Sequence, residues 1–299
     1  MNDSDEFQEL TALRKDVPPV SARAHQAGRR RLLDEIAGPS PRRRGLPSRR
    51  LLLSGALAGT LAAGVAAYQI AAPHGSQTAA AADILGRAAD TLSPARPLHP
   101  RPEQYVYSET TLVTGALVNR NRTWSSADGS RPGLRESHGD IDNSTTTLPP
   151  YRPGQGLLDA PYLTLARLPT DAEALLARLT RDPSVLLHKS PATRTLAVWG
   201  LMRGLVSTAP PAQQAALFRA AARLPGIRRT DTAVDIDGVT GVAVGLDDPA
   251  LGRVEMVFDA VDSHYLGERV VQSDRPDQVQ FSYAVRRIGV VDRPGLLPR

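Results

Sequence analysis

Hydrophobic and polar residues alternate through the C-terminal third of the chain, as they do in strands that bury one face. The pattern predicts five strands, at residues 228–236, 239–246, 253–259, 265–272 and 279–288. In the third strand, Val254, Met256 and Phe258 are predicted to face a core. Arg253 and Glu255 are then predicted to face water. Regular alternation of this kind favours an antiparallel meander with one face covered by helices.

The middle of the chain mixes helical spacing with alternation. Apolar residues recur at helical spacing in four predicted helices, at residues 79–92, 171–181, 192–208 and 211–224. Residues 104–115 and 120–127 alternate like strands, and a further short strand is expected after the turn at Asp128-Gly129. Residues 139–161, rich in Pro, Gly, Asp and Thr, are predicted to be a long loop. The order of helix, strands, helices and strands predicts one α+β domain.

One uninterrupted apolar run, residues 51–72, stands apart from both patterns. About 20 residues of helix, rising roughly 1.5 Å each, cross a hydrocarbon layer of about 30 Å. The run has no polar face, which disfavours the alternative of a helix buried in a soluble core. We therefore predict one transmembrane helix over residues 51–72.

Charge around the run predicts its orientation. Arginines precede it closely, namely Arg31, Arg42, Arg43, Arg44, Arg49 and Arg50, whereas beyond it the first Lys or Arg is Arg87. Because cytoplasmic flanks are enriched in positive charge, residues 1–50 are predicted to lie in the cytoplasm and residues 73–299 outside. The predicted location is the cell membrane, with a short cytoplasmic segment and a large extracytoplasmic domain.

The same region offers a second interpretation. Residues 48–54, SRRLLLS, resemble the twin-arginine export signal, Ser/Thr-Arg-Arg-x-hydrophobic-Leu-Lys, except that Ser54 stands where lysine is common. Small residues at 79–82 offer a cleavage site. The alternative function is therefore an exported carrier of lipid or another apolar ligand, released after cleavage. Against cleavage stands the segment before the run, which is long for a signal arm.

The cytoplasmic segment contains two short helical patterns. Apolar residues recur at helical spacing between Phe7 and Val17, and Pro18-Pro19 ends that pattern. A second predicted helix runs over residues 21–36. Two helices of this length do not bury enough surface to be stable alone. Residues 1–36 are therefore expected to be disordered, to lie on the membrane, or to fold against a partner protein, and the sequence leaves these three states open.

Loose motifs at both ends of the chain carry a resemblance to a known family. They are residues 6–14 (EFQELTALR), 16–20 (DVPPV), 27–33 (AGRRRLL), 242–245 (VAVG), 257–259 (VFD) and 265–269 (YLGER). The chain resembles an uncharacterised family of single-pass actinobacterial membrane proteins, often encoded beside extracytoplasmic-function sigma factors. The layout is also similar to membrane-anchored anti-sigma factors, although the zinc-containing kind needs Cys ligands that this chain lacks. By that analogy, residues 1–36 would contact a sigma factor or another cytoplasmic regulator.

The outer domain carries an architectural resemblance of its own. Its predicted element order resembles the open half-barrel of periplasmic lipoprotein carriers and of the periplasmic sensor domains that modulate anti-sigma factors. The resemblance implies an open, half-barrel-like antiparallel sheet covered by helices. It also implies a binding or sensing role, with an apolar ligand as one expected partner outside the cell.

Composition narrows the range of partners. The net charge is +5 at pH 7, and nearly all of the excess lies in residues 1–50. A nearly neutral outer domain is a poor nucleic-acid binder, because that binding depends on neutralising phosphates. The basic cluster at residues 42–50 is better explained as a membrane-proximal anchor attracted to anionic lipid. The absence of Cys excludes disulfides, thiolate catalysis and Cys-based zinc sites.

No constellation of residues predicts catalysis or a metal. Asp262-Ser263-His264 has the residue types of a hydrolase, but neighbours in a turn cannot form the relay, so a hairpin connection is expected. Residues 140–144 (DIDNS) begin like a calcium loop but lack its later glycine and glutamate, and the histidines never fall at zinc-ligand spacing. Trp124 and Trp199 are expected to fill the core. We therefore expect a protein that is not an enzyme, with no catalytic, cofactor-binding or metal-binding residues.

Overall fold

The computed structural model describes residues 74–236, 239–272 and 275–298. The predicted cytoplasmic segment at residues 1–50 and the predicted transmembrane helix at residues 51–72 lie outside this described part and stay predictions. Within the described residues, no helix combines the length and the apolar character needed to cross a membrane.

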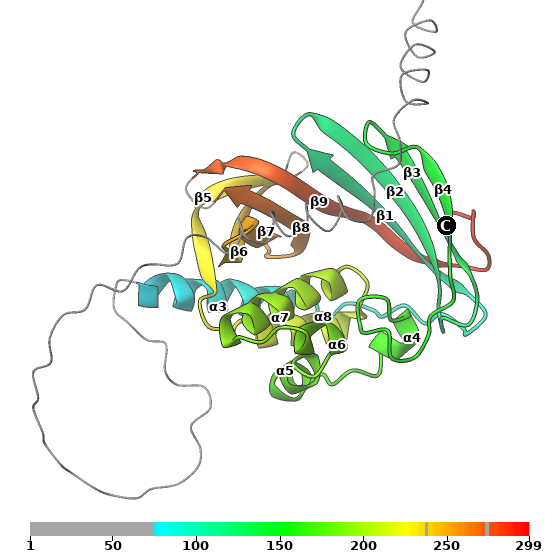
Figure 1. Ribbon diagram of the computed structural model, residues 1–299, viewed down its shortest axis with the longest axis horizontal. Helices are drawn as coiled ribbons and strands as arrows, with labels where there is room; N and C mark the ends of the chain where they lie inside the picture. The colour runs from blue at the N-terminus through cyan, green and yellow to red at the C-terminus, as the bar shows by residue number, and fades with distance from the viewer. Residues whose placement is uncertain (1–73, 237–238, 273–274, 299) are drawn as a thin grey trace, which may run out of the picture. The chain divides into compact units, whose positions relative to one another are not determined.

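Nine strands among the described residues form one antiparallel sheet, in the order β4-β3-β2-β1-β9-β8-β7-β6-β5 (Figure 1). The strands are β1 (Tyr105–Thr114), β2 (Leu117–Ser126), β3 (Gly133–Gly139), β4 (Ser144–Leu148), β5 (Arg228–Ile236), β6 (Val239–Asp248), β7 (Gly252–Asp259), β8 (Tyr265–Gln272) and β9 (Arg275–Val291). The last strand, 17 residues long, pairs with β1 on one side and with β8 on the other. It therefore joins the four strands at the start of the domain to the four strands that precede it. The predicted α+β class and the antiparallel sheet are confirmed.

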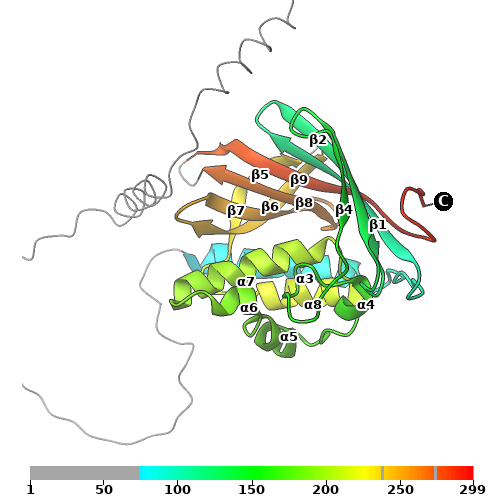
Figure 2. The ribbon, with the colours of Figure 1, turned by 45° about the vertical axis from the view of Figure 1, so that its right-hand side comes forward.

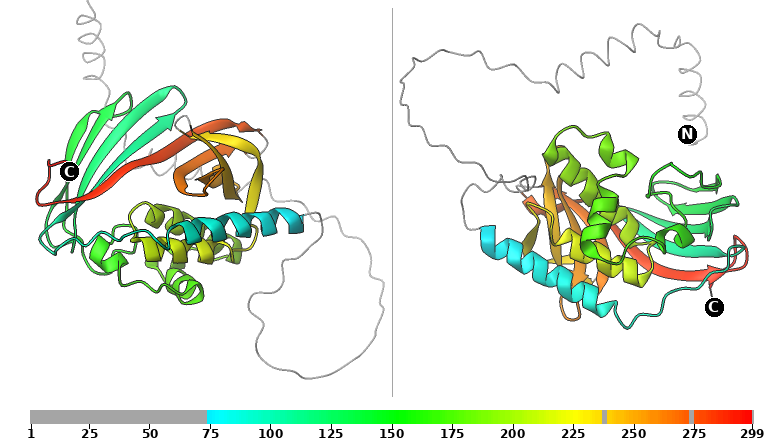
Figure 3. Two further views of the ribbon diagram at one scale, coloured as in Figure 1. Left: turned by 180° about the vertical axis from the view of Figure 1, so that it is seen from behind. Right: turned by 90° about the horizontal axis from the view of Figure 1, so that it is seen from below.

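The described helices are α3 (His74–Thr91), α4 (Tyr162–Leu165), α5 (Ala172–Leu179), α6 (Pro183–Leu186), α7 (Pro191–Val206) and α8 (Pro211–Ala221). Elements α3, α5, α7 and α8 confirm the four predicted helices, with ends that differ by a few residues. The helices gather beside the β5–β8 part of the sheet, while β1–β4 rise next to them (Figures 1 and 2). Helices α3 and α8 lie side by side and contact one another (Figure 3).

The core lies between the helices and one face of β6, β7 and β8, which we call the helix face. Met256 and Phe258 of β7 are buried on this face, as predicted. Phe218 of α8 packs edge-on against Phe258, with 5.2 Å between ring centroids. Trp199 of α7 donates its Nε1–H to the carbonyl oxygen of Val254 at 3.0 Å, so the buried indole has its polar atom satisfied. The predicted core positions of Val254 and Trp199 are confirmed.

The opposite face of these strands corrects one prediction. Arg253 retains 9 % of its exposure and Glu255 retains 0 %, so neither faces water. Glu255 accepts hydrogen bonds from Arg253 Nε at 2.8 Å and from Arg269 Nε at 2.7 Å. Strand β5 leans over this face, and Ile236 Cδ1 lies 2.9 Å from the place that a Cβ on Gly267 would take. The prediction was wrong because alternation assigns residues to faces and does not show that a neighbouring strand covers the second face.

The C-terminal tail covers the opposite face of β1 and β2. Tyr107 and Trp124 are direct cross-strand partners there, with ring centroids 5.4 Å apart. Trp124 donates its Nε1–H to the carbonyl oxygen of Leu296 at 2.6 Å, and Arg287 of β9 donates to the carbonyl oxygen of Pro298 at 2.5 Å. Trp124 is therefore buried, as predicted, but beneath the tail rather than beneath the helices.

The long loop predicted at residues 139–161 contains a strand. Residues 144–148 form β4, which pairs with β3 at the edge of the sheet. All of β4 except Leu148 is exposed, so polar side chains occupy both of its faces. Without a buried face there is no alternation to detect, which is why the sequence pattern indicated a loop.

Candidate functional site

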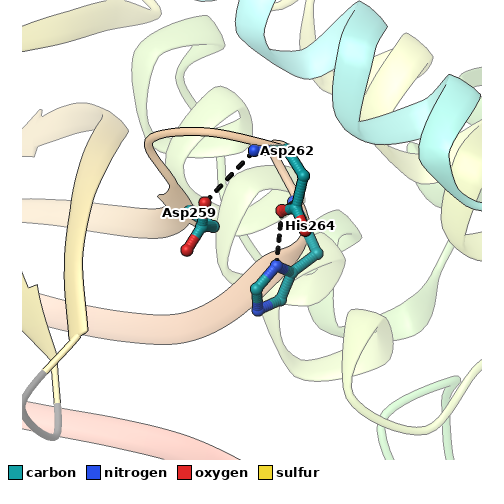
Figure 4. A group of neighbouring side chains, drawn as sticks. All are labelled: Asp259, Asp262 and His264. Carbon is teal, nitrogen blue, oxygen red and sulfur yellow. Dashed lines mark hydrogen bonds and ion pairs between the residues drawn. The ribbon is translucent and has the colours of Figure 1, made fainter.

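The turn between β7 and β8 places Asp259, Asp262 and His264 next to one another (Figure 4). One nitrogen or oxygen atom from each side chain lies within 4.8 Å of the other two. His264 Nδ1 lies 2.5 Å from Asp262 Oδ1. The turn is the hairpin connection that the sequence predicts for residues 262–264.

Ser263 stands within this turn but engages a different element. It is buried, and its Oγ accepts a hydrogen bond from Arg87 Nε of α3 at 3.3 Å. Thr91 of α3 donates its hydroxyl to the carbonyl oxygen of Asp262 at 3.0 Å. Because the serine hydroxyl contacts α3 rather than His264, the turn does not form a hydrolase relay. Its polar contacts fasten the β7–β8 turn to α3.

The two carboxylates of this turn stabilise its backbone. Asp259 Oδ1 accepts hydrogen bonds from the N–H groups of Val261 at 2.7 Å and Asp262 at 3.2 Å. Asp262 Oδ1 accepts from the N–H of His264 at 3.0 Å. That backbone hydrogen bond is the main reason why the pKa of Asp262 lies below its ordinary value, and the His264 ring adds to it. Turn stabilisation alone accounts for the arrangement in Figure 4.

A second polar group lies on the helix face, at the border between α7 and the sheet. Arg203 of α7 and Glu268 of β8 form an ion pair, with 3.0 Å between Nη1 and Oε2. Their side chains retain 17 % and 16 % of their exposure, so solvent reaches the edge of the pair. Tyr265 also lies on β8, and Tyr283 of β9 is the direct cross-strand partner of Glu268. We call Arg203, Glu268, Tyr265 and Tyr283 the inner polar cluster.

Burial controls ionisation in the inner polar cluster. It raises the pKa of Glu268 above the ordinary value, while the charge of Arg203 lowers it. Burial also holds the pKa of Tyr265 well above its ordinary value, and the charge of Glu268 adds to the effect. The pKa of Tyr283 is raised mainly by burial, against hydrogen bonds to hydroxyls of β1 and of the end of α7, which lower it. Both tyrosines are therefore neutral hydroxyls, and Glu268 is easier to protonate than an exposed glutamate.

The ion pair between Arg203 and Glu268 contains donor and acceptor atoms that make no hydrogen bond within the described residues. Arg203 Nε, Arg203 Nη1 and Glu268 Oε2 are buried atoms without a hydrogen-bond partner within the described part of the chain. Arg203 Nη1 and Glu268 Oε2 are thus close enough for an ion pair, but their angles do not allow a hydrogen bond. Buried polar atoms nearly always have such a partner, so the geometry suits an additional polar group. The chemistry available here is the binding of a charged or polar group.

Helix α7 leaves space next to the cluster. Gly200 lies on the same side of α7 as Arg203, three residues before it, and Gly204 follows Gly200 one turn later. A Cβ at Gly200 would meet nothing within 4 Å. A Cβ at Gly204 would lie 2.4 Å from Leu158 Cδ2, so the Leu158 side chain, itself 54 % exposed, fills that position. The open space next to the cluster is therefore at Gly200.

Sequence analysis did not single out the inner polar cluster, although two signals for it exist. Arg203 is the one charged residue in the apolar stretch 195–206 of a predicted helix. Glu268 shares its face of β8 with Val270, since it lies two residues before it. A charge on the core side of a helix and another on the core side of a strand are each unusual unless they are paired.

A separate groove of ≈ 680 Å³ lies where the end of α3, residues 92–100, α4 and the start of α8 meet. Its walls combine Ala, Leu and Pro side chains with the polar side chains of Ser93, His99, Tyr162, Thr170, Gln213 and Arg219. Gln213 forms part of the wall and donates its Nε2–H to the carbonyl oxygens of Ala166 at 3.0 Å and Leu168 at 3.2 Å. Those hydrogen bonds join α8 to the segment after α4, so the groove has a rigid side.

No protein-family model and no curated protein matches this chain. Among solved structures, it is similar to MucB in the MucA/MucB complex of Pseudomonas aeruginosa, at 10% identity and a TM-score of 0.29, covering 74% of this chain and 59% of that chain. It is also similar to MucB alone, at 12% identity and a TM-score of 0.29, covering 74% and 61%. A LolA superfamily protein from Nitrosomonas europaea matches at 8% identity and a TM-score of 0.22, covering 72% and 94%. The match spans about three fifths of the MucB chains, and TM-scores of this size describe a distant likeness.

Proposed function

We propose that this chain is a single-pass membrane protein without catalytic activity, whose outer domain binds a ligand or partner. Residues 1–36 on the inner side then contact a regulator such as a sigma factor. The observation that carries the binding role is the inner polar cluster, whose charged atoms pair closely and still lack hydrogen-bond partners among the described residues. Such a site binds a polar group, and within the described residues no nucleophile is aligned with a base beside it.

The membrane assignment rests on the sequence. Residues 51–72 are long and apolar enough to span a bilayer, and the arginines before them favour an inner N-terminus. Helix α3 begins at His74, directly after this run. The outer domain therefore starts within a few residues of the proposed membrane surface.

Export and release of a carrier remains the alternative, and α3 argues against its proposed cleavage site. Residues 79–82 lie inside α3, where Ala81 retains 0 % exposure in the core. Cleavage there would remove the first turns of a helix whose Ile84 and Leu85 pack against the rest of the core. Loss of those turns is costly to stability, so a retained anchor fits the fold better.

Cysteine labelling in intact cells tests the topology. The chain has no natural Cys, so single substitutions report their own positions without background. We expect a membrane-impermeant maleimide to label Ala250→Cys, which lies in the exposed β6–β7 turn, and to label Ser21→Cys only after lysis. Protection of Ala250→Cys in intact cells would refute the proposed orientation. Release of the labelled domain into the medium, shortened at its N-terminus, would favour the carrier.

Copurification tests the regulatory half. The full chain, extracted in detergent, is expected to retain a sigma factor of the extracytoplasmic-function class. Leu10→Asp together with Leu13→Asp removes the apolar side of the first predicted helix and is expected to abolish that retention. Glu9→Gln, a change at a neighbouring polar position, serves as the control. Equal recovery from all three proteins, or from none, would remove the sigma-factor contact from the proposal.

A further inference from the structure

We infer that the inner polar cluster binds the carboxylate of a small aliphatic acid and that Glu268 takes up one proton as the acid anion enters. The inference rests on the proposed binding role of the outer domain and specifies the ligand class of that site. Arg203 supplies the positive charge, and the open space on α7 at Gly200 accommodates the aliphatic body.

Arg203 is suited to a carboxylate because its donors are available. Its Nε and Nη1 are buried without a hydrogen-bond partner in the part of the chain that the structure describes, while Nη1 already lies 3.0 Å from a carboxylate oxygen of Glu268. A guanidinium carries five N–H donors and is always charged, so it can hold a second carboxylate in addition to the first. Hydrogen bonds between these two charged groups are stronger than neutral ones, particularly at a partly buried site.

Keeping two carboxylates ionised next to one arginine is unfavourable in free energy, because the two negative charges repel each other. The groups that face Glu268 are Arg203 from α7, Tyr265 from its own strand β8 and Tyr283 from β9, while Arg135 of β3 acts at longer range through Tyr283. Both tyrosines are neutral, so Arg203 is the one close positive charge among the residues that the structure describes. When a ligand carboxylate arrives, like-charge repulsion favours the protonated form of Glu268. One anion and one proton therefore bind together, and the net charge of the site is unchanged.

Space for the aliphatic body follows from α7. Leu196, Gly200 and Gly204 succeed one another at intervals of four residues, so they form one side of the helix. A Cβ at Gly200 would meet nothing within 4 Å, whereas Leu158 Cδ2 lies 2.4 Å from the Cβ position of Gly204 and fills it. The open space at Gly200 thus lies between the aliphatic side chains of Leu196 and Leu158, which suit an unbranched chain.

Binding is measured on the full chain in nanodiscs of neutral lipid, with octanoate labelled with carbon-13 at its carboxyl group. Empty nanodiscs correct for partition of octanoate into lipid. We expect saturable binding that is tighter at about pH 6 than at about pH 8, because proton uptake by Glu268 accompanies it. Octanol, which lacks the charge, is expected to bind at least about tenfold more weakly than octanoate.

Variants assign the binding to individual residues. Arg203→Met is expected to weaken octanoate binding about tenfold or more, since it removes the charged donors. Glu268→Gln mimics the protonated carboxyl and is expected to bind at about pH 8 as tightly as the natural protein does at about pH 6. The control is Arg223→Met, which removes a half-exposed arginine paired with Glu173 on α5 and is expected to change nothing. Arg203→Lys, which keeps the charge but loses the planar fork of N–H donors, is also expected to weaken binding and covers the case in which Arg203→Met does not fold.

The outcomes separate this inference from the proposed function. Unchanged octanoate affinity in folded Arg203→Met or Arg203→Lys, equal affinity for octanol, or tighter binding at higher pH would each overturn the carboxylate site. The proposed outer location would survive all three results if Ala250→Cys is labelled in intact cells. Protection of that cysteine would refute the proposed function, whatever octanoate does.

Discussion

Glu255 of β7 lies directly opposite Arg269 of β8, and 2.7 Å separate Glu255 Oε2 from Arg269 Nε in a pair whose side chains retain 0 % and 5 % of their exposure. The other carboxylate oxygen accepts from Arg253 Nε and from the Thr230 hydroxyl. One carboxylate thus holds three strands, β5, β7 and β8, together beneath a surface that water does not reach.

Glu255→Gln is expected to lower the free energy of unfolding by about 3–5 kcal/mol, because it leaves the buried Arg269 without its counter-charge and Arg253 with Asp247 alone. Urea unfolding of the full chain measures the change. Glu173→Gln is the control, since that carboxylate is 85% exposed and pairs with a half-exposed arginine. A loss below about 1 kcal/mol in Glu255→Gln would mean that the network contributes little.

The ionisation of Glu268 predicts a pH dependence. Its folded-state pKa is raised by burial, so the folded protein binds more protons than the unfolded chain between the ordinary glutamate pKa and the raised value. Stability contributed by this group is therefore present at low pH and falls as pH rises through that window. We expect the free energy of unfolding, measured relative to Glu268→Gln at each pH, to decline with rising pH there. An increase would contradict the direction of the shift.

Removal of the C-terminal tail is expected to expose Trp124. Truncation after Arg293 deletes the carbonyl of Leu296 that accepts the indole N–H and uncovers the ring. We expect a red shift of the Trp124 emission and a loss of roughly 1–3 kcal/mol of stability, since the apolar ring is exposed to water and its hydrogen bond to the tail is lost. Fluorescence of the Trp199→Phe background isolates Trp124, because the chain has two tryptophans. Unchanged emission would show that the tail does not cover the ring.

Two glycine substitutions are expected to have opposite effects. Gly200→Ala should stabilise the protein by about 0.5–1 kcal/mol, because it lies inside α7 with open space around its Cβ position. Gly245→Ala should destabilise it, because a Cβ there would lie 2.5 Å from the Val254 carbonyl oxygen and 2.7 Å from Glu255 Cγ. Thermal unfolding of both variants measures the contrast. Equal effects on stability would contradict the open space at Gly200 and the close contacts at Gly245.

The five C-terminal strands were predictable from alternation, two of them to the residue. The predicted segments 228–236 and 265–272 coincide with β5 and β8, whereas the ends of β6, β7 and β9 differ from the prediction by up to four residues. Predictions failed where alternation carries no information, as in β4, which is exposed on both faces, and for Arg253 and Glu255, whose face is covered by a strand from elsewhere in the sequence. The pairing of β9 with β1 was also beyond the pattern, since a period of two does not identify a distant partner.

The inner polar cluster was not predictable from the sequence pattern for a similar reason. Arg203 and Glu268 are 65 positions apart in the sequence, and each taken alone is an isolated charge among apolar neighbours. Their pairing depends on the packing of α7 against β8, which local periodicity does not encode. Trp199, by contrast, was assigned correctly, because a large aromatic residue in an apolar helix rarely has another place to go.

The pairing of β9 with both β1 and β8 constrains the order in which this domain can fold. Strand β9 is synthesised last, yet it occupies the middle of the sheet. Strand β1 therefore cannot pair with β9 until roughly 180 further residues have been synthesised. Premature termination anywhere before that point would leave two unclosed edges, and fragments cut between the halves would be prone to aggregate.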